Sequence, residues 1–128
     1  MRYIEFDIPI YDWSLCVVTL YDETDRDEYV RLCERYNIDS EQSNEDIDKI
    51  VKGVKDFACC YTAGDYHTGL ICIGPWSEEY LFHGNIGHEV RHYVDDIQSR
   101  IGLENGEATA YLTGYIHLEI YKRVKELK

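Results

Sequence analysis

The sequence "NIGHEVRHYVDDI", residues 85–97, contains two histidines four positions apart, and a glutamate directly follows the first. Apolar residues recur here at helical spacing, and on a helical wheel they fall within an arc of about 100°, the width of a stripe that faces a core. The stripe consists of Ile86, Val90, Tyr93, Val94, Ile97 and Ile101. The pattern therefore predicts an amphipathic helix that carries the histidine pair beside its buried face.

The two histidines, His88 and His92, lie one turn apart on this helix, so that both rings face the same way. Zinc binds imidazole nitrogens at about 2.0 to 2.1 Å, and a rigid helix fixes both rings before the ion arrives. Glu89 lies on the neighbouring flank, where a carboxylate can accept a proton from an activated water and return it to a leaving amine. The motif predicts a zinc site with Glu89 as general base; the competing interpretation is an amphipathic helix that happens to contain histidine.

A third ligand is required, and Glu107 is the best candidate. It opens the last predicted helix, and the residues one turn on are small or apolar: Ala110, Tyr111 and Gly114. An unpaired carboxylate on such an inward face is costly to bury, and zinc coordination relieves that cost. The alternative is a first-turn glutamate favoured only by the helix dipole. We expect the zinc ligands to be His88, His92 and Glu107.

Two further acidic residues have weaker cases. Asp96 lies one turn beyond His92, where it can accept the free N–H of a ligating histidine or remain an ordinary solvated carboxylate. Glu104, at the frayed end between the two helices, is a weaker alternative ligand.

The remaining pattern predicts an α+β fold in one domain over residues 1–128. Alternating apolar residues predict a strand at 4–8, and apolar runs predict strands at 14–20, 56–61 and 69–73, the last two as a hairpin. Helical spacing predicts helices over about 25–36 and around 47–54, with a loop at 37–46 between them. From residue 85 onward the pattern is helical, with Gly102 ending one helix and Asn105 capping the next. We expect a small mixed or antiparallel sheet packed on helices, with two long C-terminal helices carrying the metal site.

Composition excludes several classes of partner. Acidic residues outnumber basic ones by 25 to 13, and a formal charge of −12 repels phosphate backbones and anionic membranes. We expect no nucleic-acid and no membrane partner. No signal-peptide core or long apolar span is present, which favours a cytoplasmic location. Five cysteines without a C-x-x-C pair are expected to be reduced and mostly buried. Oligomeric state is not predicted.

The motifs "HEVRH" and "GEATAYLTGYI", in the last third of the chain, resemble the zincin-like metallopeptidases, in particular small H-E-x-x-H proteins of bacteriophages and bacterial mobile elements. The resemblance implies a zincin-like fold and a gluzincin-type site: His88, His92 and Glu107 as zinc ligands, a water in the fourth position, and Glu89 as base. Two features depart from thermolysin-like enzymes. Tyr111 replaces an aspartate four residues after the glutamate ligand, and the connection between the ligand helices is shorter. By analogy, "GLICI" at 69–73 would be the edge strand that pairs with extended substrate.

The predicted function is zinc-dependent hydrolysis of a peptide bond in a peptide or protein. The residue that stabilises the oxyanion is left open among four candidates: Tyr111, His83, Tyr80 and His67. The alternative is a catalytically inactive, zincin-derived protein-binding module with a structural zinc. A closed fourth coordination position would favour that alternative, because catalytic zinc keeps the place for water. A third interpretation, an acidic mimic of nucleic acid that blocks a DNA-binding protein, is supported only by the net charge.

Overall fold

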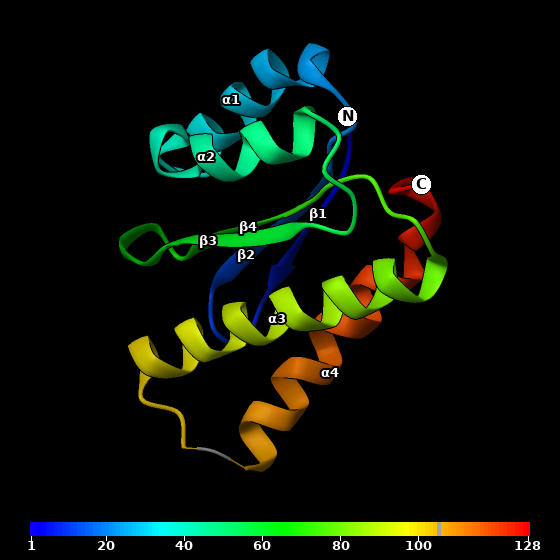
Figure 1. The fold of residues 1–128 in the computed structure, drawn as a ribbon. Coiled ribbons are helices and arrows are strands. Elements are labelled where there is room, and N and C mark those ends of the chain that lie inside the picture. Colours follow the sequence, from blue (N-terminus) through cyan, green and yellow to red (C-terminus); the bar gives the residue numbers. More distant parts are fainter. Residues whose placement is uncertain (105) are drawn as a thin grey trace.

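A four-stranded mixed sheet forms the middle of three layers in the computed structural model, which describes residues 1–104 and 106–128. The strands are β1 (Arg2–Ile8), β2 (Trp13–Thr19), β3 (Ala58–Ala63) and β4 (Thr68–Ile73), in the spatial order β1-β2-β4-β3. The central pair, β2 and β4, is parallel, and the two outer pairs are antiparallel. Helices α1 (Arg26–Arg35) and α2 (Ser40–Val51) cover one face, and α3 (Glu79–Ile101) and α4 (Glu107–Lys122) cover the other (Figure 1).

The two central strands are apolar on both faces because both faces are covered. Cys16 and Val18 of β2 belong to the core under α1 and α2, while Leu15 and Val17 belong to the core under α3 and α4. The residues of β4 divide in the same way, and Leu70 to Ile73 are fully buried. The predicted α+β class, with a small mixed sheet packed on helices, is confirmed.

The first pair of helices is partly as predicted. The helix expected over about 25–36 is α1, but the loop expected at 37–46 is wrong, because α2 already begins at Ser40. The side chain of Asp39 accepts a hydrogen bond from the backbone N–H of Glu41 at 2.9 Å and so caps α2. Asp46 therefore lies on a helix rather than in a loop.

Helix α3 lies close against the sheet through its predicted stripe. All six stripe residues are buried except Ile101, which is 38% exposed near the helix end. The ring of Tyr93 lies directly over Gly69 of β4, where an added Cβ would come within 2.2 Å of Cε2. The Tyr93 hydroxyl donates a hydrogen bond to the carbonyl of Ser14 at 3.0 Å. The absence of a side chain at Gly69 thus allows α3 to approach β4 closely.

The ends of the two C-terminal helices test further expectations. Gly102 ends α3 in a left-handed conformation, with φ of 72°, as predicted. The expected cap Asn105 lies outside the described residues. Helix α4 buries Leu112, Ile116 and Ile120, spaced four residues apart, against the core.

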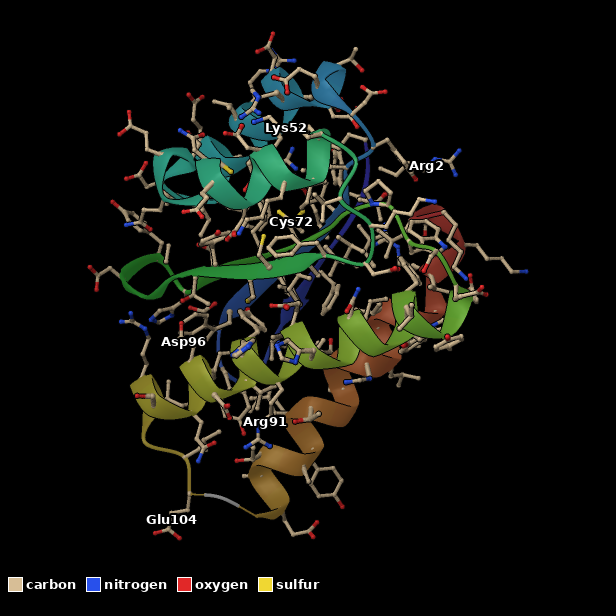
Figure 2. All side chains as sticks on the ribbon, in the orientation of Figure 1. Arg2, Lys52, Cys72, Arg91, Asp96 and Glu104 are labelled. Carbon is tan, nitrogen blue, oxygen red and sulfur yellow. The ribbon has the colours of Figure 1, made fainter. Side chains whose placement is uncertain are left out.

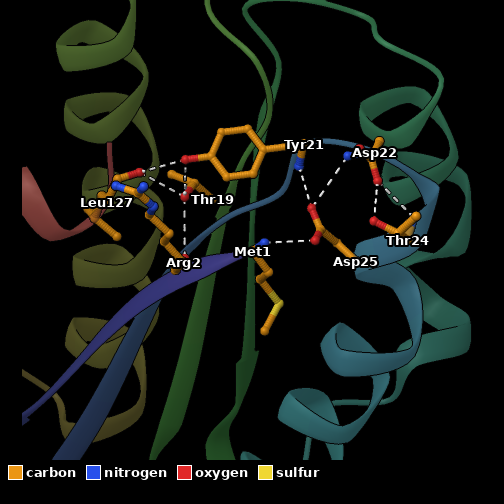
Figure 3. A network of polar contacts seen from close by, with 8 residues as sticks. All are labelled: Met1, Arg2, Thr19, Tyr21, Asp22, Thr24, Asp25 and Leu127. Atoms are coloured by element: carbon orange, nitrogen blue, oxygen red, sulfur yellow. Dashed lines mark hydrogen bonds and ion pairs between the residues drawn. The ribbon is translucent and has the colours of Figure 1, made fainter.

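A polar network ties the chain ends to the sheet (Figure 3). The amino group of Met1 donates to Asp25 at 2.7 Å, in a contact that is partly buried. The other oxygen of Asp25 accepts the backbone N–H of Tyr21 at 2.7 Å. The hydroxyls of Thr19 and Tyr21 both donate to the carbonyl of Leu127, at 2.8 and 3.2 Å. No helix in the described part of the chain is long and apolar enough to cross a membrane.

Candidate functional site

The histidine pair presents two nitrogens to one point. The Nε2 atoms of His88 and His92 are 3.1 Å apart, and the ring planes meet at 76°. Two nitrogen ligands of a tetrahedral zinc, each about 2.05 Å from the ion, are separated by about 3.3 Å. The spacing of the pair therefore fits two adjacent positions on one zinc ion. It also fits a single hydrogen bond between the rings when one ring carries the Nε2 proton.

A polar cleft of about 480 Å³ contains the pair. Strand β3 forms its floor, α3 forms one wall, and α2 contributes one acidic residue from the other face of the sheet. In Figure 2, Asp96 lies on the side of α3 toward the β3–β4 hairpin, and Arg91 lies on the opposite side, toward α4. The lining residues are Asp46, Phe57, Ala58, Cys59, Cys60, Thr62, His88, Glu89, His92 and Asp96.

Glu89 is the buried acid of this cleft. Its side chain is only 8% exposed, and its Oε1 lies 3.9 Å from Nε2 of His88, too far for a hydrogen bond. Among the described residues, none donates a hydrogen bond to this carboxylate. Burial raises the pKa of Glu89, the two histidines oppose that rise, and the charge of Asp46 adds to it. The result is a carboxylate that holds a proton more readily than an exposed glutamate.

Two aspartates flank β3 and are held by it. The hydroxyl of Tyr61 donates to Asp46, and the hydroxyl of Thr62 donates to Asp96. The expectation that Asp96 accepts the free N–H of a ligating histidine stays a prediction, because its partner here is Thr62. Sequence reasoning missed Asp46, which lay in the predicted loop. The pattern "DSEQ" at 39–42, an aspartate cap followed three residues later by glutamine, was a signal for the helix that carries it.

The structure does not bring Glu107 to the histidine pair. The face of α4 that was expected to point inward is exposed, and an added Cβ on Gly114 would meet nothing within 4 Å. The inward face is instead the one that carries Leu112 and Ile116, because this stripe buries more apolar surface. Glu107 borders a separate depression with Tyr111 and Leu118.

The other candidates also lie away from the cleft. Glu104 is exposed beyond the end of α3 (Figure 2). His83 contacts the Tyr121 hydroxyl and Glu79, and His67 stacks on Trp13. None of the four proposed oxyanion donors lines the cleft. Within residues 1–104 and 106–128, no three His, Cys, Asp or Glu side chains are grouped to hold a metal.

The edge-strand assignment is corrected. The run at 69–73 forms most of β4, which lies between β2 and β3, so the prediction that it is the edge strand is wrong. The edge beside the histidine pair is β3, whose residues are mostly half-buried. The fully buried run Leu70 to Ile73 requires neighbours on all sides, which an edge position does not give.

The cysteines are free thiols, as expected, and four of the five are buried. The exception is Cys60, which lines the cleft.

Comparison with known proteins identifies no relative: no family model matches the chain, and no curated protein or solved structure is significantly similar to it.

Proposed function

We propose that this protein is a zinc-dependent hydrolase that cleaves a peptide bond, with His88 and His92 as zinc ligands and Glu89 as general base. One observation carries the proposal: a buried carboxylate without a hydrogen-bond donor lies beside two imidazole nitrogens that are 3.1 Å apart. An ordinary surface helix gains nothing from burying such a carboxylate, because the desolvation cost is not offset.

The histidine pair fits two of the ligand positions of a zinc ion in type and spacing. Imidazole nitrogens are common zinc ligands, and their separation here is close to the edge of a zinc tetrahedron. When bound, zinc supplies Lewis acidity toward water and toward the carbonyl oxygen of the substrate. The resemblance assigns a further ligand position to Glu107, which lies at the exposed start of α4. The proposal therefore rests on the histidine pair, and the Glu107 assignment is tested separately.

Glu89 has the properties of a proton shuttle. A general base works best when its pKa lies near the working pH, and burial moves the pKa of Glu89 upward in that direction. Its carboxylate can accept the proton of the attacking water and later deliver that proton to the departing amine. The absence of a donor from the described residues leaves its oxygens free for these two transfers.

Strand β3 gives the site a means of holding an extended peptide. Its outer edge has no neighbouring strand among the described residues, and it borders the same cleft as Glu89. An extended peptide can add to such an edge through main-chain hydrogen bonds. The open cleft leaves room for substrate and water, and this favours hydrolysis over a purely structural zinc.

The direct test is the Glu89→Gln variant, assayed for zinc content and for cleavage of a mixed peptide library. We expect zinc binding to persist and cleavage to fall by about 100-fold or more, because the general base is removed. The matched control is Glu79→Gln, the same substitution on the same helix, at an exposed glutamate that contacts His83. Control activity should equal wild type. Undiminished cleavage by Glu89→Gln would overturn the base assignment, and no zinc-dependent cleavage by wild type would overturn the proposed function.

A further inference from the structure

The cleft places two carboxylates on opposite sides of one strand edge. Successive residues of a strand point to opposite faces, so Tyr61 and Thr62 of β3 reach toward α2 and α3 respectively. Each donates its hydroxyl proton to an aspartate on that side, Asp46 on α2 and Asp96 on α3. The free edge of β3 therefore runs between two acidic groups that are already oriented.

Apart from the histidine pair, the ionisable side chains that line the cleft are three carboxyl groups and two thiols. Its lining includes three carboxylates, from Asp46, Glu89 and Asp96, and no lysine or arginine. Lys49 approaches from the margin, with its Nζ 3.6 Å from Asp46 and 3.7 Å from Glu45, and it is substantially exposed. A concave surface lined by one sign of charge concentrates ligands of the opposite sign. The formal charge of −12 on the whole chain acts in the same direction.

A second observation indicates that a ligand belongs in this cleft. The Glu89 side chain is more than nine-tenths buried, borders the cavity, and receives no hydrogen bond from the described residues. Its one ion-pair contact among the described residues is with Nε2 of His88 at 3.9 Å, so a ligand that donates a hydrogen bond to this carboxylate would offset part of the cost of its burial. Glu89 therefore indicates that a ligand enters the cleft, and the acidic lining indicates that this ligand brings positive charge.

We propose that the substrate segment held in this cleft carries two consecutive basic residues, arginine or lysine. If a peptide adds to the edge of β3, its adjacent side chains point to opposite faces of the sheet. One cationic side chain then reaches Asp46 and the next reaches Asp96. This inference rests on the proposed function for the location of the substrate, and it goes further by naming the substrate class.

The test measures binding separately from hydrolysis. Wild-type protein kept in a metal chelator is titrated into fluorescent peptides of equal length whose central pair is Arg-Arg, Ala-Ala or Glu-Glu, and fluorescence anisotropy is read at low and at physiological salt. We expect Arg-Arg to bind at least tenfold more tightly than Ala-Ala at low salt. The advantage should shrink as salt rises, because part of it is Coulombic.

Three variants locate the effect. Asp46→Asn and Asp96→Asn should each reduce the Arg-Arg advantage about threefold or more, because each removes one charge while keeping an oxygen acceptor for Tyr61 or Thr62. The control is Asp95→Asn on the same helix, whose carboxylate is paired with Arg91 at 2.9 Å and does not line the cleft. It should bind Arg-Arg as wild type does. Thermal melting verifies that each variant is folded.

The outcomes separate the two proposals. Equal binding of Arg-Arg and Ala-Ala, or an equal loss in Asp95→Asn and Asp96→Asn, would overturn the substrate assignment. Zinc-dependent cleavage without a basic preference would overturn it as well, while leaving the proposed function in place. A clear Arg-Arg preference that maps to Asp46 and Asp96 would support the assignment even if wild type cleaved no peptide, an outcome that would overturn only the proposed function.

Discussion

The Nε2 atom of His88 lies 3.1 Å from the Nε2 atom of His92, one helical turn away on α3. Two nitrogens at this distance cannot both carry a proton without repelling each other, so the arrangement favours rings that share one proton or share an ion. The helix creates the spacing and carries Glu89 directly beside His88, and packing of the helix on the sheet buries Glu89. The proposed zinc chemistry thus depends on the spacing of these two nitrogens.

The position of Glu107 gives a first prediction. Because this residue is exposed at the start of α4 and borders a different depression, Glu107→Gln should leave the zinc Kd within about twofold of wild type. A chromophoric chelator in competition with the protein measures this Kd. A loss of affinity of tenfold or more would show that α4 supplies a ligand when zinc binds, and would support the assignment that the zincin resemblance implies.

The close approach of α3 to β4 gives a second prediction. Gly69→Ala should destabilise the protein by about 1 to 3 kcal/mol, because the new methyl group would overlap the ring of Tyr93. Urea unfolding followed by circular dichroism measures the change. Gly84→Ala is the control: it lies in α3 with open space around its Cβ position, and it should stabilise the helix by up to about 1 kcal/mol. If Gly69→Ala left the free energy of unfolding unchanged, the ring of Tyr93 would not lie in close contact with Gly69.

The partly buried ion pair of Met1 with Asp25 gives a third prediction, measured on protein that starts at Met1. Asp25→Asn should cost about 1 to 3 kcal/mol of unfolding free energy, because it leaves the ammonium group without its counter-charge. Asp27→Asn, at an exposed position of α1, is the control and should change stability by less than about 0.5 kcal/mol. If the two substitutions lowered the free energy of unfolding equally, the contact between Met1 and Asp25 would not stabilise the fold.

The same pair predicts a pH dependence. Burial alone would raise the pKa of Asp25, but hydrogen bonds from the Met1 amine and from backbone N–H groups outweigh it, and the pKa is lowered. A lowered pKa stabilises the fold above the unfolded value of about 3.9, and this contribution is lost as the pH falls through the folded value. The stability difference between wild type and Asp25→Asn should therefore be constant near neutral pH and shrink below about pH 4. Urea unfolding of both proteins at a series of pH values measures this difference. A difference that grows toward low pH would show that the pKa of Asp25 is not lowered in the folded protein.

How far the sequence predicts this protein depends on the strength of each local pattern. The periodicity of α3 is strong, so its stripe and the positions of His88 and His92 were predictable. Helix α4 offered two competing faces, and the one that carries Leu112 was buried because it is more apolar. The small residues near Glu107 led to the prediction of an inward face there. Small side chains are as compatible with solvent as with a close helix contact, so they do not distinguish the two faces.

Spatial order was not predictable from chain order. The run at 69–73 precedes α3 directly, yet β3 is the edge strand, because β4 pairs with β2 in parallel across a long connection. Asp46 joins the cleft only through the way α2 packs beside β3, a long-range relationship that no local pattern contains. The motif itself was visible in the sequence, but the acidic surroundings that suggest a substrate class required the fold.

Zinc coordination by His88 and His92 is tested by an equilibrium zinc titration of the wild-type protein beside the double variant His88→Ala/His92→Ala. The control is His83→Ala/His117→Ala, which removes two histidines outside the cleft. We predict one zinc per chain for wild type and control, and affinity at least about 100-fold weaker for the cleft variant. Equal zinc affinity in all three proteins, or no zinc binding by wild type, would show that His88 and His92 are not zinc ligands and would leave the pair as part of an ordinary helix.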